Sequence, residues 1–351
     1  MRVADKNLAE VWDQGFTVVE GFLDPTMLKD ARDALWEIYP KPEEYFADPS
    51  KHPKFARSQF SGLRFFPYPS WALNGVAVYP DLVDAAERFL SAKDIEIYKI
   101  ELWAKYSGAI NYDQPHHRDF SNHTLVVPRL DKRHTQMTTF ILLSDVTAVD
   151  GPTKLVPLKY TKDLPLTPRE RALGEFFDKE VSAEAPAGSL LIYKTDVLHR
   201  GSEFGAPQRS RFVMLVDFQE RGWRWQGKMS WPHHAGRHEM IHALERMTPR
   251  ERDLFGWPPP GSEYWNEQTL ADVGARYPRM DIDAISQDGK ARISSSSVRP
   301  RTAQPTGQPA ILQGGPPGRR RRPADAWRGG CRYVVDRHEA RQRGMTRCAA
   351  R

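Results

Sequence analysis

The 351-residue sequence has few cysteines and no long hydrophobic run. Only two cysteines occur, Cys331 and Cys348, so the first 330 residues hold no disulfide framework, as is usual in a reducing compartment. No apolar run reaches the ~18 residues that a membrane helix needs, and residues 1–6 lack the apolar segment of a secretory signal. Internal repeats are absent too. We therefore expect a cytoplasmic globular protein without a membrane partner.

Acidic residues are scarce only near the C-terminus. From Asp288 onward, 15 Lys and Arg stand against 4 Asp and Glu, a net charge of +11, so the preceding residues carry −5 of the total of +6. This end has Ser-rich and Arg-rich stretches at 294–297 and 319–322, and it lacks the periodic apolar residues that a packed core requires. We expect one domain over residues 1–283 and a disordered basic tail over 284–351. The tail could contact phosphates, but beyond Trp327 and Tyr333 it has no interleaved stacking aromatics, so we expect no nucleic-acid partner.

The body of the sequence reads as a mainly β protein with peripheral helices. Short segments that alternate or are wholly apolar, separated by Gly and Pro, predict strands at 16–19, 95–103, 124–127, 137–143, 153–157, 189–193 and 211–218. Apolar residues at helical spacing predict helices around 8–12, 25–36, 81–90 and 237–247. Residues 40–72 lack periodicity and read as a loop that could fold over a pocket, and an aromatic, Pro-rich cap follows residue 218. Without regular strand–helix alternation, an antiparallel sandwich or barrel is favoured.

The segment from Gln114 to Phe120 carries the most informative chemistry. It contains His117 and Asp119, whose side chains would point to one face of an extended chain. A second imidazole, His199, lies far downstream, after the predicted strand at 189–193. Two histidines and one carboxylate on one side of a metal leave open positions, which suits non-haem Fe(II) and O2 chemistry. His116 would face away from Asp119, and we expect it behind the metal site or in solvent.

Arg211 begins a strand of largely apolar residues. A guanidinium at the start of a buried strand costs free energy unless it meets an anion. Its planar fork matches the carboxylate of a small diacid. The strand therefore predicts an anion-binding residue near the metal site.

Together these segments resemble the phytanoyl-CoA dioxygenase-like (PhyH) family of Fe(II)/2-oxoglutarate-dependent oxygenases. The resemblance runs from Gly15 to about residue 283, and its specific parts are residues 117–119, 150–157 and 187–192, followed by His199, Ser202 and Arg211. The family commonly reads His-Gly-Ser where this chain reads His-Arg-Gly-Ser, one residue longer. The resemblance implies a double-stranded β-helix (a cupin-like jelly roll) with the metal at its mouth.

The resemblance also implies the roles of particular residues. His117, Asp119 and His199 would be the iron ligands and so the catalytic residues, and Arg211, Ser202 and Thr138 would contact 2-oxoglutarate. The expected function is that of an oxidoreductase, a dioxygenase that converts 2-oxoglutarate and O2 into succinate and CO2 while hydroxylating a small organic substrate. Neither the identity of that substrate nor the oligomeric state follows from the sequence.

Two alternatives remain open at this point. The residues from His238 to His242 match the H-E-x-x-H pattern of zinc hydrolases, with Glu239 between the two imidazoles and Glu263 or Glu267 as conceivable third ligands. The preceding residues are polar and Pro249 ends the segment early, so a surface helix is favoured. The other alternative is a non-catalytic jelly-roll binding protein that keeps a metal for structure.

Overall fold

The structure is a computed structural model that describes residues 2–285 except 59, 110–111, 124–127, 129–134, 223–228, 235–236 and 263. The strand expected at 124–127 and the tail beyond 285 lie outside the described residues. Among those residues, no helix is both long and apolar enough to cross a bilayer.

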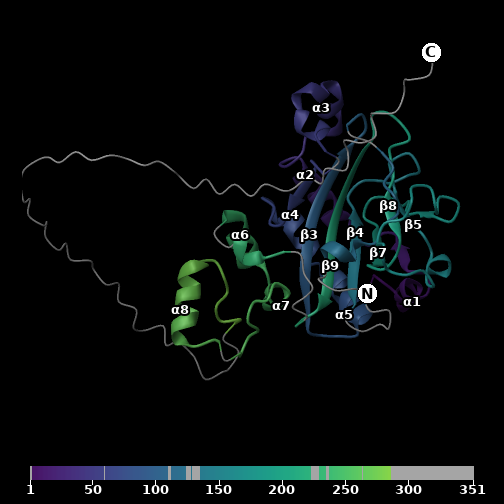
Figure 1. Ribbon diagram of the computed structural model, residues 1–351. Helices are drawn as coiled ribbons and strands as arrows, with labels where there is room; N and C mark the ends of the chain where they lie inside the picture. The colour runs from purple at the N-terminus through teal and green to yellow at the C-terminus, as the bar shows by residue number, and fades with distance from the viewer. Residues whose placement is uncertain are drawn as a thin grey trace, which may run out of the picture. The chain divides into compact units, whose positions relative to one another are not determined.

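Within the described residues, nine strands form two antiparallel sheets. Their bounds are β1 Phe16–Val19, β2 Leu63–Phe65, β3 Ile95–Tyr106, β4 Gln136–Leu142, β5 Thr153–Leu155, β6 Val181–Ser182, β7 Leu190–Lys194, β8 His199–Gly201 and β9 Ser210–Glu220. The larger sheet has the order β1-β7-β4-β9-β3-β2 and the smaller one β6-β5-β8. Every pairing is antiparallel, and the long strands β3 and β9 lie side by side in the larger sheet (Figure 1).

Helices surround the sheets. They are α1 Asp5–Gln14, α2 Pro25–Leu35, α3 Pro42–Ala47, α4 Trp71–Ala77, α5 Pro80–Leu90, α6 His238–Arg246, α7 Pro249–Asp253 and α8 Glu267–Arg276, with short 3-10 helices at 49–51, 53–56, 119–122, 158–160 and 231–234. The start of α2 follows from its sequence, since the Asp24 side chain accepts a hydrogen bond from the Thr26 amide at 2.9 Å and Pro25 occupies the first turn. The prediction of a mainly β protein with peripheral helices is confirmed.

Side-chain alternation gives the larger sheet two different faces. On β9, Phe212, Met214, Val216 and Phe218 belong to the main hydrophobic core, which also contains the buried residues of α1, α2, α4 and α5. The alternate residues Arg211, Val213 and Leu215 line a pocket on the other face. Strand β3 divides in the same way, with Ile100, Leu102 and Ala104 in the core and Glu101, Trp103 and Lys105 in the pocket. One face therefore stabilises the fold, and the other is available for chemistry.

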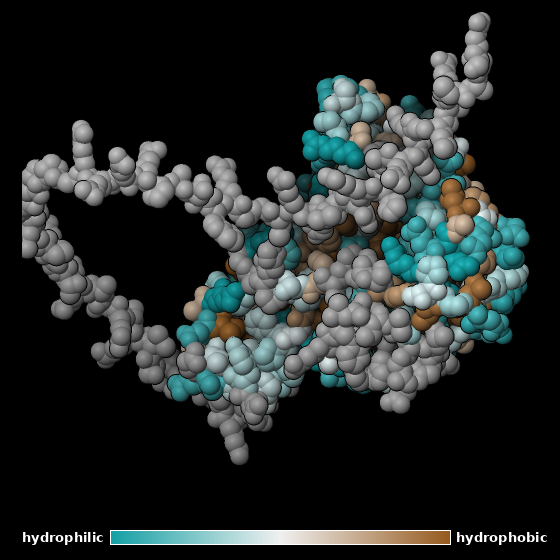
Figure 2. All heavy atoms as spheres, viewed as in Figure 1, coloured by the Kyte–Doolittle hydropathy of each residue, from teal (hydrophilic) through white to brown (hydrophobic). Residues whose placement is uncertain are grey.

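The segment 40–72 was predicted as a loop, and this prediction was too simple. It contains α3, two 3-10 helices, β2 and the beginning of α4. Apolar residues are buried here without a helical or strand period, because aromatic rings pack on one another: Tyr45 stacks on Tyr106 with ring centroids 4.1 Å apart. Phe60 and Leu63 from this segment line the pocket. In Figure 2 the visible surface of α3 is mostly hydrophilic, whereas hydrophobic surface shows between α3 and the sheet that contains β5.

The position of the domain boundary can be tested by truncation. Ile285, two residues beyond the expected boundary, is 1% exposed and belongs to the main core. Burial of an isoleucine side chain stabilises a fold by about 1.5–3 kcal/mol. A chain ending at residue 283 is expected to melt several degrees below the full chain, and one ending at 294 within a degree of it. Differential scanning calorimetry measures both, and a large loss on removing 295–351 would contradict a dispensable tail.

Candidate metal centre and co-substrate pocket

Two histidines far apart in the sequence are joined by backbone hydrogen bonds. The amide of His117 donates to the carbonyl of His199 at 2.8 Å, and the amide of His199 donates to the carbonyl of His117 at 3.0 Å. This isolated antiparallel bridge brings β8 against the extended segment that precedes Asp119. The ring centroids of the two histidines lie 4.6 Å apart.

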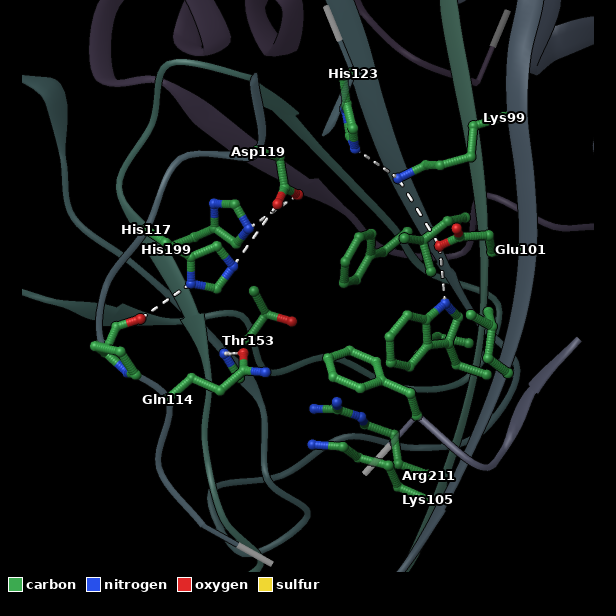
Figure 3. A pocket seen from close by; sticks show the side chains of 18 of the residues that line it. Lys99, Glu101, Lys105, Gln114, His117, Asp119, His123, Thr153, His199 and Arg211 are labelled. Atoms are coloured by element: carbon green, nitrogen blue, oxygen red, sulfur yellow. Dashed lines mark hydrogen bonds and ion pairs between the residues drawn. The ribbon is translucent and has the colours of Figure 1, made fainter. Parts of the chain in front are cut away.

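Asp119 completes a three-residue cluster. Its carboxylate lies 3.2 Å from Nε2 of His199 and 3.7 Å from Nε2 of His117. Among the residues that the structure describes, these three form the one group of His, Cys, Asp or Glu whose ligand atoms all lie within 4.8 Å of one another. Figure 3 shows the three side chains converging on one side of the pocket. The sequence prediction that these residues come together agrees with this geometry.

Hydrogen bonds fix the tautomer of both imidazoles. Nδ1 of His117 lies 3.0 Å from the Pro115 carbonyl, and Nδ1 of His199 lies 3.1 Å from the Val197 carbonyl. A carbonyl oxygen can only accept, so each Nδ1 carries the proton and each Nε2 presents a lone pair toward Asp119. This is how metal-binding histidines are usually oriented by their surroundings.

The ionisation states also suit a cation. Burial, with His199 nearby, lowers the pKa of His117 to about 4, so this imidazole is neutral at pH 7. Burial acts to raise the pKa of Asp119, but a proton on Nε2 of His199 would outweigh it through its charge and hydrogen bond and would hold that pKa well below its usual range. A metal cation bound at the same place would act on Asp119 in the same direction. Neutral imidazoles and an ionised carboxylate are the forms that ligate metals.

The cluster opens on a cavity of about 450 Å³. It is lined by polar, aromatic and aliphatic residues from β2, β3, β4, β5, β8, β9 and the intervening segments, among them Phe60, Leu63, Lys99, Glu101, Trp103, Lys105, Tyr112, Gln114, Phe140, Thr153, Arg169, Glu170, Gly201, Arg211, Val213 and Leu215. Figure 3 shows Lys99, Glu101, Lys105 and Arg211 on the wall opposite the metal cluster. A volume of this size accommodates small-molecule ligands.

A buried charged network on that wall was missed by sequence reasoning. Nζ of Lys99 lies 2.7 Å from Asp217 and 4.0 Å from Glu101, and its side chain is 2% exposed. Nε1 of Trp103 donates to Glu101 at 3.1 Å. Alternating polar residues on β3 predicted a half-buried strand. The polar face of such a strand can be exposed to bulk solvent or can line a polar pocket, and no local sequence signal distinguishes these two environments.

Of the three residues expected to contact 2-oxoglutarate, only Arg211 lines the pocket. The Ser202 hydroxyl instead donates to the Pro152 carbonyl at 2.6 Å, and Gly201 occupies the pocket wall. The additional residue after His199 explains this, since successive residues of a strand face opposite ways and Gly201 shares the face of His199. Thr138 is fully buried and is not part of the pocket lining, which Phe140 reaches from the same strand.

His116 faces away from Asp119, as the alternation predicts. It is fully buried rather than exposed, and its Nε2 lies 3.0 Å from Glu180. Arg200, which also lies on the side of β8 away from the pocket, donates to the same carboxylate at 2.7 Å. Glu180 thus joins the residue before His117 to the residue after His199, on the side away from the pocket.

The H-E-x-x-H segment forms helix α6, with the rings of His238 and His242 4.0 Å apart. Within the described part of the chain, no third His, Cys, Asp or Glu joins them to form a metal-binding group. Glu263 lies outside the described residues, and Glu239 lies 3.4 Å from Arg237. The structure offers no support here for a zinc hydrolase.

A mainly β fold with a His–Asp–His cluster at a polar pocket is the arrangement expected of a non-haem iron enzyme. The sequence model of the family described as Phytanoyl-CoA dioxygenase (PhyH) matches residues 12–211, a span that contains the whole cluster and ends at Arg211. The chain belongs to this family. It is accordingly an enzyme of the Fe(II)/2-oxoglutarate-dependent class, with Fe(II) and 2-oxoglutarate as cofactors, and the donor set at residues 117, 119 and 199 fits the iron.

Solved structures with a similar fold were also found, at low sequence identity. The epimerase SnoN in complex with Fe3+, alpha ketoglutarate and nogalamycin RO is 14% identical, with a TM-score of 0.45, over 65% of this chain and 87% of that chain. AviO1 from Streptomyces viridochromogenes is 16% identical, with a TM-score of 0.46, over 64% and 99%. The carbocyclase SnoK from nogalamycin biosynthesis is 15% identical, with a TM-score of 0.47, over 66% and 90%. No curated protein matches the chain.

Proposed function

We propose that this protein is an Fe(II)/2-oxoglutarate-dependent dioxygenase that hydroxylates a small organic substrate on a double-stranded β-helix. The observation that carries the proposal is the cluster of His117, Asp119 and His199 at the edge of a cavity of about 450 Å³. Family membership supports the reaction class. The choice of hydroxylation over another oxidation is the simplest outcome for such a site.

His117, Asp119 and His199 would hold the iron through two Nε2 atoms and one carboxylate oxygen. When bound, the iron supplies the redox chemistry that couples O2 and 2-oxoglutarate to substrate oxidation. Three protein donors leave positions for small molecules on the pocket side. The tautomers fixed by the Pro115 and Val197 carbonyls keep both Nε2 lone pairs available without a proton having to leave.

Arg211 would bind the distal carboxylate of 2-oxoglutarate. The residue is 8% exposed, and its buried Nη1 has no hydrogen-bond partner among the described residues. Burial lowers the pKa of Arg211 to about 10, so the side chain is still charged at neutral pH. A buried cation without a partner is stabilised strongly by an anion that reaches it.

The aromatic side chains of the cavity would position the primary substrate and limit the access of water. Phe60 and Tyr112 are partly exposed, whereas Trp103 and Phe140 lie deeper. Excluding water from such a site protects reactive species from side reactions and strengthens the electrostatic interactions within it. The substrate is therefore expected to carry an apolar or aromatic portion that contacts these rings.

The proposal is tested without knowledge of the substrate. Anaerobic addition of Fe(II) and 2-oxoglutarate is expected to produce a weak visible charge-transfer band, which zinc cannot produce. Admitting O2 should then give slow formation of succinate, even without a substrate. A protein that keeps its metal only for structure would show no succinate above a metal-free control, and this result would reject the proposal.

A further inference from the structure

Two cations face each other across neighbouring strands in the pocket. Lys105 on β3 pairs directly with Arg211 on β9, and both side chains line the cavity. Figure 3 shows them next to each other, with their terminal nitrogens extending in the same direction. Like charges directly opposite in an antiparallel sheet repel and are destabilising. Such a pair therefore favours a ligand that supplies negative charge to both.

No protein anion neutralises this pair in the described structure. Lys105 has neither a hydrogen bond nor an ion pair with any described residue, and Nη1 of Arg211 is buried without a partner. The charge of Asp150 acts to raise the pKa of Arg211, but the two side chains form no ion pair. The Asp150 carboxylate is already bound by Arg209 at 2.6 and 3.0 Å and by Thr147. Among the described residues, the two cations thus have no counter-ion of their own.

The surroundings of the Lys105 amine leave room for a ligand. Lys105, Gln114, Gly201 and Arg211 all line the cavity. A Cβ atom placed on Gly201 would lie 3.7 Å from Nζ of Lys105 and 2.9 Å from Oε1 of Gln114, so the absence of a side chain at Gly201 keeps space open beside the amine. The titratable and charged groups that face the same cavity are Lys99 and Glu101 on its own strand, Arg211 on β9, His199 on β8, and Tyr112, His117, Asp119, His123, Arg169 and Glu170 on the connecting segments. Of these, Arg211 is the one whose charge lowers the pKa of Lys105.

We propose that Lys105 is a second cation of the co-substrate site and that the distal carboxylate of 2-oxoglutarate accepts hydrogen bonds from both Lys105 and Arg211. The proposal rests on the proposed function, because it requires that this pocket bind 2-oxoglutarate. A carboxylate has two oxygens and about four lone-pair sites, enough for a guanidinium and an ammonium together. One dianionic co-substrate would then relieve the repulsion that the adjacent cations create.

The arrangement couples co-substrate binding to a proton. Burial, and then the charge of Arg211, lowers the pKa of Lys105 to about 7. A bound carboxylate favours the ammonium form and raises that pKa. Below about pH 7 the free protein already carries the proton, so affinity is independent of pH there. Above it, the affinity for 2-oxoglutarate falls by up to tenfold per pH unit, until the pH reaches the raised pKa of the complex.

Isothermal titration calorimetry of the Fe(II)-loaded protein, without O2 and from pH 6 to 9, tests this. In buffers of different ionisation enthalpy, wild type should take up close to one proton on binding 2-oxoglutarate at pH 8. Lys105→Arg should keep the affinity measured at low pH and lose both the pH dependence and the proton uptake. Lys105→Met should bind about 10- to 100-fold more weakly at pH 6.5, the range for one hydrogen bond to a charged group, with no pH dependence from this group.

Two controls isolate the contact. Lys51→Met, at a side chain that is 75% exposed, should match wild type throughout. 2-Oxobutyrate has the same 2-oxo acid end as 2-oxoglutarate but no distal carboxylate, so its affinity should be equal in wild type and Lys105→Met. If Lys105→Met weakened both ligands equally, a structural role would replace the proposed one.

Other outcomes separate this inference from the proposed function. If wild type binds 2-oxoglutarate and Lys105→Met binds it with the same affinity and pH profile, the inference fails and the proposed function stands. Lys105 would then be free to serve an anionic group of the primary substrate. If wild type binds no 2-oxoglutarate at any pH, both fail together.

Discussion

Replacing His199 by alanine is expected to abolish 2-oxoglutarate turnover and the visible band that Fe(II) and 2-oxoglutarate give without O2. The same result is expected for His117→Ala and Asp119→Ala. Each variant leaves two of the three donors that lie within 4.8 Å of one another, and two donors hold Fe(II) poorly. Absorption spectroscopy measures the band, succinate formation measures turnover, and metal analysis after gel filtration measures retained iron.

His242→Ala is the matched control for these variants. His242 lies on α6, and with His238 it belongs to the competing motif. We expect its substitution to leave the band, the iron content and turnover unchanged. The opposite pattern, with tightly bound zinc lost only on changing His238 or His242, would make the protein a hydrolase and overturn the assignment of the metal centre.

Arg211→Leu is expected to raise the KM for 2-oxoglutarate by roughly 30-fold to several thousand-fold, with little change in the affinity for iron. Removing one partner of a buried charged pair costs about 2–5 kcal/mol, and each ~1.4 kcal/mol is a factor of ten. The guanidinium lies against the pocket and has no counter-ion in the part of the chain that the structure describes, so the loss should appear as weaker binding of the co-substrate. Steady-state kinetics at saturating iron measure the change.

Arg209→Leu tests whether the strand register is assigned correctly. Arg209 is 41% exposed at its side chain and binds Asp150, whose side chain is 3% exposed. Its loss leaves a buried carboxylate without its ion-pair partner and is expected to lower the melting temperature, with a far smaller effect on the KM for 2-oxoglutarate. A larger KM effect from Arg209→Leu than from Arg211→Leu would contradict the proposed anchor. Arg32→Leu, at an exposed position of α2, should alter neither quantity.

The cluster of His117, Asp119 and His199 could be predicted from the sequence because each of its two parts has its own local signal. His117 and Asp119 are two residues apart, and His199 follows an apolar strand closely. Arg211 was also predictable, since a cation at the start of an apolar strand requires a special environment. The strands that these residues flank have clear alternation or continuous apolar runs, so most of the larger sheet was predicted as well.

The missed features depend on contacts between distant segments. Strands β6 and β8 have two and three residues, too few for a period to be recognised. Lys99 and Lys105 look like ordinary solvent-facing positions of β3, because only the covering segments turn that face into a pocket. Ser202 was assigned by analogy with the family pattern, and the extra residue before it reversed the face on which its side chain lies.

The reciprocal backbone hydrogen bonds between His117 and His199 have a consequence for the metal-free protein. Since the backbone itself holds the two imidazoles together, we expect His117 and His199 to keep their relative position when no iron is bound. The amide hydrogens of both histidines should therefore exchange slowly with deuterium even after treatment with a chelator, and added Fe(II) should restore activity without a refolding step.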